Sequence, residues 1–296
     1  MDKKPVLALV VPCYNEEEII ECVVEELSSL LSCLISEDVI SENSFMSFVD
    51  DVSTDNSWQI LNNLSQKNNF LKAMKLAYNA GHQNALLCGM VENDADIYIT
   101  LDCDLQDDIT IIPQMIQKYK NENVDIVYTV RTNRNTDSFF KKFFANMFYA
   151  VLPLFKINNL PNSADYRLVT NSVVKFLKSI NEQGLYLRGL LQEYNFKYSI
   201  IKYTRKNRIG GKEKYSFIAS FKLAINGILN SSLVPIRCVT IVGFIALIFS
   251  AIIKSLVLLS AALNLIALGI VGEYLGRTFT EVKKRPNYVV KDKTGN

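Results

Sequence analysis

Short apolar runs alternate with longer amphipathic segments over the first 130 residues of the chain. The short runs are rich in β-branched residues and end in turn-forming residues, which is typical of buried strands. The longer segments repeat apolar residues at helical spacing. The pattern predicts strands at Val6–Val11, Ser47–Val49, Leu71–Leu76, Asp96–Leu101 and Asp125–Val130, and helices at Glu16–Ser32, Asn56–Gln66, His82–Glu92 and Ile109–Asn121. Because strand and helix alternate with short connections, we expect an α/β fold with a mostly parallel sheet covered by helices on both faces.

Polar clusters follow three of the predicted strands. Residues 14–16 follow the first strand, Asp50 and Asp51 follow the second, and residues 102–108 follow the fourth. Ligands of such sheets bind beyond the carboxyl ends of the strands. The three clusters therefore predict one site at this edge of the sheet.

The third cluster, ITLDCDLQDD, has the composition of a metal site. Asp102 and Asp104 are two residues apart at the end of a strand, so both side chains are expected to point to one side. Two carboxylates and the amide oxygen of Gln106 suit Mg²⁺ or Mn²⁺, which complete their coordination with substrate phosphates. The ion would neutralise charge on a departing diphosphate. The alternative interpretation is a solvated acidic turn.

Three residues near these clusters have simpler interpretations. Asp107 and Asp108 precede the predicted helix at 109–121, where negative charge suits the N-terminal end of the helix dipole. His82 is the only histidine and stands at a predicted helix start. Taken alone it is expected to be a satisfied polar residue at that helix start, with metal ligation or proton transfer as alternatives.

Charge is unevenly distributed along the chain. Residues 92–108 carry seven acidic side chains and no basic one, whereas residues 197–222 carry eight Lys or Arg against Glu213 alone. This contrast indicates a bound cation and a separate anionic partner. The basic segment is either a solvated face or a surface for anionic lipid headgroups. Nucleic acid is excluded as a partner because the basic segment has no aromatic platform and adjoins an apolar region.

The C-terminal region is apolar enough to predict membrane insertion. Residues 238–271 contain one charge, Lys254, in 34 positions. Two spans need slightly more than this length, so we expect a tight hairpin broken near Lys254–Ser260. One tilted span with an interfacial segment is the alternative. Residues 138–156 are expected to form a buried helix or a membrane-contacting one. Cations flank the apolar region on both sides, which favours the hairpin and places both ends in the cytosol: Arg237, Arg277, Lys283, Lys284 and Arg285.

Seven segments resemble, in order, the motif series of family 2 glycosyltransferases. They are VVPCYNEE, VDDVSTDNSW, NAGHQNALLCGM, ITLDCDLQDD, SADYRLV, YLRGLL and RIGGKEKY. The chain is most similar to the polyprenyl-phosphate glycosyltransferases, the group that contains dolichyl-phosphate mannose synthases and bactoprenol glucosyltransferases. The resemblance extends from about residue 6 to residue 290. It implies a GT-A (Rossmann-like) fold, a nucleotide-sugar donor, a divalent metal and a lipid-phosphate acceptor.

The resemblance also implies roles for individual residues. On the donor side, Pro12, Tyr14, Asn15 and Glu16 would lie along the nucleotide, and Asp51 would hydrogen-bond the base. The remaining implied roles concern the metal and the reacting phosphates. Asp102, Asp104 and Gln106 would hold the metal, with Asp102 also near ribose and sugar, and Arg131 would lie near the reacting phosphates. Asp165 and Arg167 would face the sugar and the acceptor phosphate. Arg208 and Lys214 would sit on a loop that closes over the phosphates.

Together these implications predict an inverting hexosyltransferase of the membrane. The donor is a nucleotide diphosphate sugar, with UDP-glucose favoured, and the acceptor is a polyprenyl phosphate of the undecaprenyl type. The lipid-linked sugar would serve cell-envelope glycans or their modification. A homo-tetramer is compatible with the resemblance. The expected organisation is a cytoplasm-facing catalytic domain (1–215), a juxtamembrane amphipathic helix (216–236), a transmembrane hairpin (237–276) and a cytosolic tail (277–296).

Some positions depart from the family pattern. Val52 stands where the family has Gly, and a valine disfavours positive φ, so we expect a reshaped turn there. Glu213 adds an anion to the basic loop, and the apolar region is shorter than is typical. These departures motivate one alternative, an inactive relative that acts as a membrane partner. A metal-dependent nucleotidyltransferase is the other alternative, but the acidic sequence PCYNEEE replaces the basic glycine-rich loop that it would require.

Overall fold

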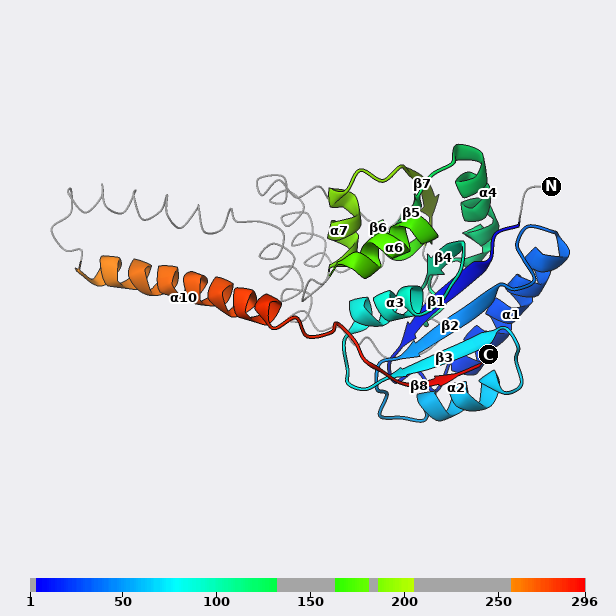
Figure 1. Ribbon diagram of the computed structural model, residues 1–296, viewed down its shortest axis with the longest axis horizontal. Coiled ribbons are helices and arrows are strands. Elements are labelled where there is room, and N and C mark those ends of the chain that lie inside the picture. The colour runs from blue at the N-terminus through cyan, green and yellow to red at the C-terminus, as the bar shows by residue number, and fades with distance from the viewer. Residues whose placement is uncertain (1–3, 132–162, 181–185, 205–256, 296) are drawn as a thin grey trace.

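An eight-stranded sheet forms the centre of the molecule (Figure 1). The computed structural model describes residues 4–131, 163–180, 186–204 and 257–295. The strands lie in the order β7-β5-β6-β4-β1-β2-β3-β8. Their bounds are β1 (Leu7–Cys13), β2 (Phe45–Asp50), β3 (Leu71–Leu76), β4 (Ile97–Thr100), β5 (Ile126–Arg131), β6 (Ser163–Thr170), β7 (Tyr198–Tyr203) and β8 (Val290–Thr294).

Most strands of this sheet are parallel. The pairs β1–β2, β1–β4, β2–β3 and β5–β7 are parallel, whereas β6 pairs antiparallel with both β4 and β5. The expected mostly parallel sheet is therefore confirmed. The insertion of β6 between β4 and β5 was not predicted. Residues 167–170 of β6 pair with β4, so residues 163–166 extend past the end of β4, where the acidic loop begins.

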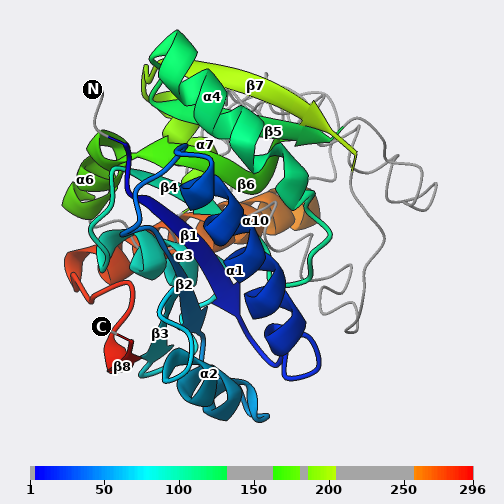
Figure 2. The same cartoon turned by 90° about the vertical axis from the view of Figure 1, so that its right-hand side faces the viewer.

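Helices cover both faces of the sheet, as expected (Figure 2). Along β1, Leu7, Leu9 and Val11 pack with α1, α2 and α4, whereas Ala8 and Val10 pack with α3, α6 and α7. Both faces of this central strand are therefore buried, which explains its continuous apolar run. The helices are α1 (Ile20–Ser36), α2 (Ser57–Ser65), α3 (His82–Val91), the short 3-10 helix η1 (Ile109–Ile111), α4 (Ile112–Glu122), α6 (Asn171–Ser179), α7 (Leu187–Glu193) and α10 (Val257–Val282).

The predicted strands and helices of the first 131 residues are all present, with shifted bounds. The largest shift is at α1, which begins at Ile20 rather than at Glu16. Residues 14–19 instead form a loop, in which the backbone N–H of Glu16 donates to the hydroxyl of Ser57, 2.9 Å away. The sequence reasoning did not identify β6, α6, α7, β7 or β8.

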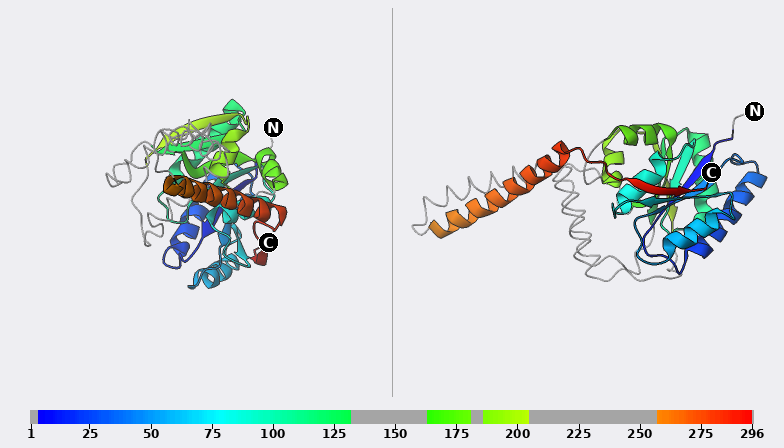
Figure 3. Two further views of the ribbon diagram at one scale, coloured as in Figure 1. Left: turned by 90° about the vertical axis from the view of Figure 1, so that its left-hand side faces the viewer. Right: turned by 60° about the horizontal axis from the view of Figure 1, so that its bottom comes forward.

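The C-terminal residues return to the sheet and cover the edge of β3. Helix α10 extends away from the α/β body, and the chain then runs back so that β8 lies beside β3 (Figures 1 and 3). β8 pairs antiparallel with β3, and Lys293 forms a 2.7 Å ion pair with Glu92 at the end of α3. The hydroxyl of Tyr78 donates to the carbonyl of Pro286 at 2.9 Å. An edge strand that would otherwise expose its backbone groups is thereby paired.

The predicted membrane hairpin lies only partly within the described residues. Residues 132–162, which include the apolar segment at 138–156, and residues 205–256 lie outside them. Helix α10 forms the later part of the predicted hairpin. Among the residues that the structure describes, no helix has both the length and the apolar character needed to cross a membrane. The hairpin therefore stays a prediction.

Candidate active site

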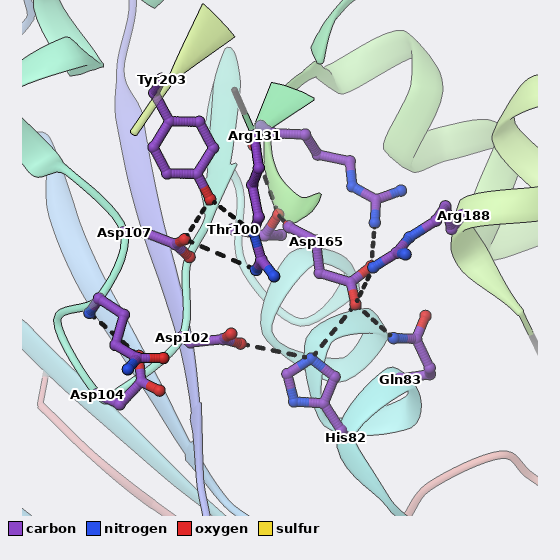
Figure 4. Close-up of polar contacts among 12 residues, drawn as sticks. His82, Gln83, Thr100, Asp102, Asp104, Asp107, Arg131, Asp165, Arg188 and Tyr203 are labelled. Atoms are coloured by element: carbon purple, nitrogen blue, oxygen red, sulfur yellow. Dashed lines mark hydrogen bonds and ion pairs between the residues drawn. The ribbon is translucent and has the colours of Figure 1, made fainter. Parts of the chain in front are cut away.

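The loops that carry the predicted polar clusters meet at one edge of the sheet. β2, β1 and β4 are neighbours and run in the same direction, so the segments that follow them start side by side. Figure 4 shows the acidic residues that follow β4 at this edge, together with side chains from the ends of β5 and β7, from β6 and from the starts of α3 and α7. The predicted convergence of the three clusters is confirmed.

The loop after β1 is fixed to the loop after β2 by side chain to backbone hydrogen bonds. Asn15 has a positive φ of 54°, and its carboxamide oxygen accepts from the backbone N–H of Thr54 at 2.7 Å. Its own N–H donates to the hydroxyl of Ser53 at 2.9 Å. Asparagine tolerates the left-handed conformation that this turn requires. Asn15 therefore has a structural role, and its predicted contact with a nucleotide stays a prediction.

Pro12 and Tyr14 bracket the end of β1. Pro12 is buried within this central strand, a position that proline usually avoids because it has no N–H to donate. β4 pairs with β1 only as far as Thr100, which lies opposite Val10. On the β4 side, Pro12 therefore has no strand partner that would need an N–H from it. Tyr14 is exposed at the open edge.

Asp51 ties the end of β2 to the segment that leads into α3. Its carboxylate is buried and accepts hydrogen bonds from the backbone N–H groups of Ala80, at 2.7 Å, and Gly81, at 2.9 Å. Burial nevertheless raises the pKa of Asp51, because these hydrogen bonds only partly offset the loss of hydration. The predicted hydrogen bond between Asp51 and a base stays a prediction.

The turn at Val52 is not reshaped, contrary to expectation. Val52 adopts φ of 62°, the left-handed conformation that glycine adopts freely. Its side chain packs against a small cluster that includes Val49, Met74 and Ala85. Packing therefore holds a β-branched residue in a conformation that it disfavours.

The acidic segment after β4 is a turn rather than an extension of the strand. β4 ends at Thr100, so the alternation of a strand does not orient Asp102 and Asp104 as predicted. The carboxylate of Asp102 lies 3.7 Å from Nε2 of His82, whereas buried Asp104 accepts from the backbone N–H of Gln106 at 3.1 Å (Figure 4).

The side chains of this acidic segment carry oxygen atoms of the kind that bind divalent metal ions. Asp102, Asp104 and Gln106 offer carboxylate and amide oxygens, which hard cations prefer. No group of three or more His, Cys, Asp or Glu side chains arranged to hold a metal occurs in the described part of the chain. Two carboxylates and one amide would leave part of the coordination of such an ion to water or substrate oxygens.

The last two aspartates of the cluster have different roles. Asp108 accepts from the backbone N–H of Thr110 at 3.2 Å and from its hydroxyl at 2.8 Å, which caps η1. Its negative charge therefore stands at a helix start, as predicted, although the capping hydrogen bond itself was not. Asp107 is buried and accepts from the hydroxyl of Tyr203 at 2.5 Å, with Nη2 of Arg131 at 4.0 Å. The prediction that Asp107 serves the helix dipole is therefore wrong, because its carboxylate is directed to Tyr203.

A second polar cluster surrounds Asp165 on β6. Asp165 forms ion pairs with Arg167, two residues along the same strand, and with Arg188 of α7 at 3.2 Å. Gln83 donates to the same carboxylate at 3.3 Å, and Nε2 of His82 lies 3.9 Å from it (Figure 4). Burial alone would raise the pKa of Asp165, but Arg188 and Arg167 outweigh it and hold the pKa well below its usual range. Asp165 is therefore an ionised counter-ion at neutral pH.

His82 connects the acidic loop to this second cluster, because Asp102 and Asp165 both lie within 4 Å of its Nε2. The structure thus brings Asp102, Asp165, Arg167 and Arg131 to one edge, as the sequence predicted. Arg208 and Lys214 lie outside the described residues. Sequence reasoning missed Gln83, Arg188 and Tyr203 and assigned Asp107 another role. Gln83 and Arg188 stand in the motifs NAGHQNALLCGM and YLRGLL, which were the available signals.

The fold and this edge define an α/β protein of the nucleotide-sugar transferase type. The glycosyl transferase family 2 model matches residues 8–223, so the chain belongs to glycosyltransferase family 2. It is 38% identical to the uncharacterized glycosyltransferase YkoT of Bacillus subtilis, over 97% of this chain and 91% of that protein. It is 30% identical to the prophage bactoprenol glucosyl transferase homolog of Escherichia coli, over 96% of this chain and 98% of that protein.

A solved structure supports the fold independently. The chain aligns with glucosyl-3-phosphoglycerate synthase of Mycobacterium tuberculosis, crystallised with Mn²⁺, UDP and phosphoglyceric acid, with a TM-score of 0.53 and 13% identity. The alignment covers 76% of each chain. At this identity the likeness shows the GT-A-like fold alone, and it agrees with the sheet observed here.

Proposed function

We propose that this glycosyltransferase moves a hexose from a nucleotide diphosphate sugar to a polyprenyl phosphate. The observation that carries the proposal is the edge of the sheet itself, where the loop after β4 meets the Asp165 cluster beside the ends of β1 and β2 in a family 2 fold. Similarity over nearly the full chain to bactoprenol glucosyl transferases supports a polyprenyl phosphate acceptor and favours glucose as the sugar.

Charge explains how such a site would work. A phosphate monoester is an anion at neutral pH, so the acceptor scarcely needs a general base. One of its oxygens attacks C1 of the sugar, the bond from C1 to the nucleotide diphosphate breaks, and the anomeric centre inverts in one displacement. Asp165, held as an ionised counter-ion by Arg167 and Arg188, is unsuited to accept a proton. Alignment of the reactants and electrostatic stabilisation of the leaving diphosphate would therefore supply the catalysis.

The donor set proposed for the metal is Asp102, Asp104 and Gln106. When bound, Mg²⁺ or Mn²⁺ would neutralise charge on the departing diphosphate. Arg131 would add a fixed positive charge at the same edge. Mn²⁺ in a crystal structure of the same fold supports a divalent ion without deciding between the two.

We also propose that the protein is membrane-anchored with its catalytic domain facing the cytoplasm. The apolar character of residues 238–271 supports this, as do the exposed large apolar side chains along α10, among them Leu268, Leu275 and Phe279. The expected result is that the full chain stays with membranes after an alkaline wash. Release into the supernatant would contradict the anchor.

The decisive experiment is a transfer assay on membranes that contain the full chain. They are incubated with a polyprenyl phosphate, Mg²⁺ or Mn²⁺, and a panel of UDP- and GDP-linked sugars, and the lipid product and its anomeric configuration are identified. We expect a β-linked polyprenyl phosphate hexose from an α-linked donor. Val52 adopts a positive φ at this turn, a conformation that glycine tolerates freely, so this departure by itself gives little support to the alternative of an inactive relative. No product with any donor would favour that alternative.

Asp104→Ala tests the metal assignment in the same assay. Loss of one carboxylate ligand is expected to lower kcat/KM by at least about 10²-fold, the effect of removing one strong electrostatic stabiliser. Asp108→Asn is the matched control, because Asn also caps helices well and should leave transfer within about twofold. Full activity of Asp104→Ala would contradict the assignment.

A further inference from the structure

Three largely buried side chains join the acidic loop to the ends of two strands. Asp107, in the loop after β4, accepts from the hydroxyl of Tyr203 at the end of β7, 2.5 Å away. That hydroxyl accepts in turn from Nε of Arg131 at the end of β5, at 3.2 Å. Asp107 and Tyr203 are 3% and 4% exposed, whereas the side chain of Arg131 keeps 28% of its surface exposed. Figure 4 shows the three converging above Asp102.

Strand pairing and ring packing fix the position of Tyr203, independently of the side chain of Arg131. Arg131 and Tyr203 are register partners at the end of the parallel pair β5–β7. The ring of Tyr203 packs edge-on against Tyr166, with ring centroids 5.7 Å apart, and the hydroxyl of Tyr166 donates to the carbonyl of Asp108 at 3.0 Å. Tyr203 is therefore a rigid support, because its position is set by strand pairing and ring packing.

Protonation and charge fit a supporting role for both residues. Burial and the neighbouring Asp107 carboxylate raise the pKa of Tyr203, so its hydroxyl stays protonated and keeps donating. In the described part of the chain Arg131 makes one hydrogen bond, from Nε, and its ion pair with Asp107 is long at 4.0 Å. The terminal nitrogens of the guanidinium are therefore not tied to a carboxylate at hydrogen-bond distance among these residues.

We infer that Asp107 and Tyr203 are positioning residues for Arg131. They hold its guanidinium at the edge of the sheet, so that its terminal N–H groups face the diphosphate of the donor. The inference rests on the proposed function, in which Arg131 meets that diphosphate. A cation fixed in advance stabilises developing charge without reorganisation, whereas a flexible arginine would first have to lose its freedom.

A double-mutant cycle tests this inference, with kcat of the full chain as the readout. Arg131→Ala is expected to lower kcat by about 10²-fold, and Tyr203→Phe by about tenfold. If Tyr203 acts through Arg131, adding Tyr203→Phe to Arg131→Ala should change kcat by less than about twofold, because coupled residues are non-additive. Tyr166→Phe is the matched control: it removes a neighbouring buried hydroxyl, and its effect should be equal in both backgrounds.

The same cycle is measured as affinity of the purified full chain for UDP with Mn²⁺, and for GDP with Mn²⁺, which requires no acceptor. A tenfold effect of Tyr203→Phe that persists in the Arg131→Ala background would overturn the inference, since it would mark a merely structural tyrosine. Asp107→Asn with unchanged kcat and nucleotide affinity would overturn it as well. Failure of sugar transfer in the wild type would refute the proposed function, whereas the nucleotide-affinity cycle would still decide the role of Tyr203.

Discussion

The two sides of the candidate site hold their carboxylates in different ways. On the side proposed to bind the nucleotide, which consists of the loops after β1, β2 and β3 and is called the nucleotide side, Asp51 accepts hydrogen bonds from two backbone N–H groups. On the reaction side, defined as the ends of β4 to β7 and the start of α7, Asp165 is held by Arg167 and Arg188. Both carboxylates are largely removed from water, yet their neighbours differ in charge.

This difference shifts the two pKa values in opposite directions. Burial raises the pKa of Asp51, and its two hydrogen bonds offset only part of that cost. At Asp165 two guanidinium groups outweigh burial, and the pKa falls well below its usual range. Backbone N–H groups thus position a carboxylate, whereas cations also keep it charged. On the nucleotide side, hydrogen bonds position the Asp51 carboxylate, whereas on the reaction side two guanidinium groups also keep the Asp165 carboxylate ionised.

Removing the charge on the reaction side should have the largest effect on stability. Asp165→Asn leaves Arg167, which is 3% exposed, without its anionic partner. An uncompensated buried charge costs about 3 kcal/mol, measured as the free energy of unfolding in urea. Asp125→Asn is the matched control, because Asp125 accepts from the backbone N–H of Lys197 at an exposed position and should change stability by less than about 1 kcal/mol. Equal effects would contradict the contrast between the sides.

The pH dependence of stability should follow from the same carboxylate. Because folding lowers the pKa of Asp165, its contribution is fully present above the unfolded pKa of about 3.9 and is lost as pH falls through the lower folded value. The stability difference between wild type and Asp165→Asn should therefore shrink as pH falls below about 4. Chemical unfolding at a series of pH values measures it. A difference that stays constant down to pH 2 would refute the ion-pair explanation.

Asp51→Asn should have a smaller effect. The amide offers one acceptor oxygen for the two N–H groups of Ala80 and Gly81, which leaves a donor poorly satisfied. The substitution also removes the cost of burying a charge, so we expect a loss of about 1 kcal/mol. Asp55→Asn is a useful comparison, because hydrogen bonds outweigh burial and lower the pKa of half-buried Asp55. If Asp51→Asn lowered the free energy of unfolding as much as Asp165→Asn, the distinction between the two sides would not hold.

Val52 should show the smallest effect. Val52→Gly relieves the left-handed conformation but loses packing and gains freedom in the unfolded chain, so the stability change should stay within about 1 kcal/mol. Val52→Ala keeps a Cβ in the same conformation and loses most of the packing, so it should be less stable than Val52→Gly. Thermal unfolding compares the two variants. If Val52→Ala is the more stable, the backbone at this turn is not strained.

Much of the fold was predictable where local patterns suffice. The first strands and helices carry long apolar runs or helical periodicity, and their connections are short, so α/β alternation followed directly. The later strands were missed because they carry weaker signals. β6 contains Asp165 and Arg167, and β8 is mostly polar, VKDKT. Their strand structure depends on partners distant in sequence, which no local pattern reveals.

The candidate site divides in the same way. The motif residues at the ends of β1, β2 and β4 were found because each cluster is continuous in sequence. The contacts of Asp107 were not, since Tyr203 lies 96 positions away and joins it only because β7 pairs with β5. Asp102 and Asp104 were identified, but their orientation was wrongly derived from a strand that ends at Thr100.

The sequence by itself determined the alternation of elements, the edge at which polar groups gather, and the cap at Asp108. Each of these depends on neighbours a few residues apart, where spacing alone carries the information. Only the tertiary structure decided which charges meet: that β6 enters between β4 and β5, that Arg188 joins Asp165, and that β8 covers β3. The physical reason is that strand pairing and ion pairs act through space, so their partners are set by the packed chain and not by order along it.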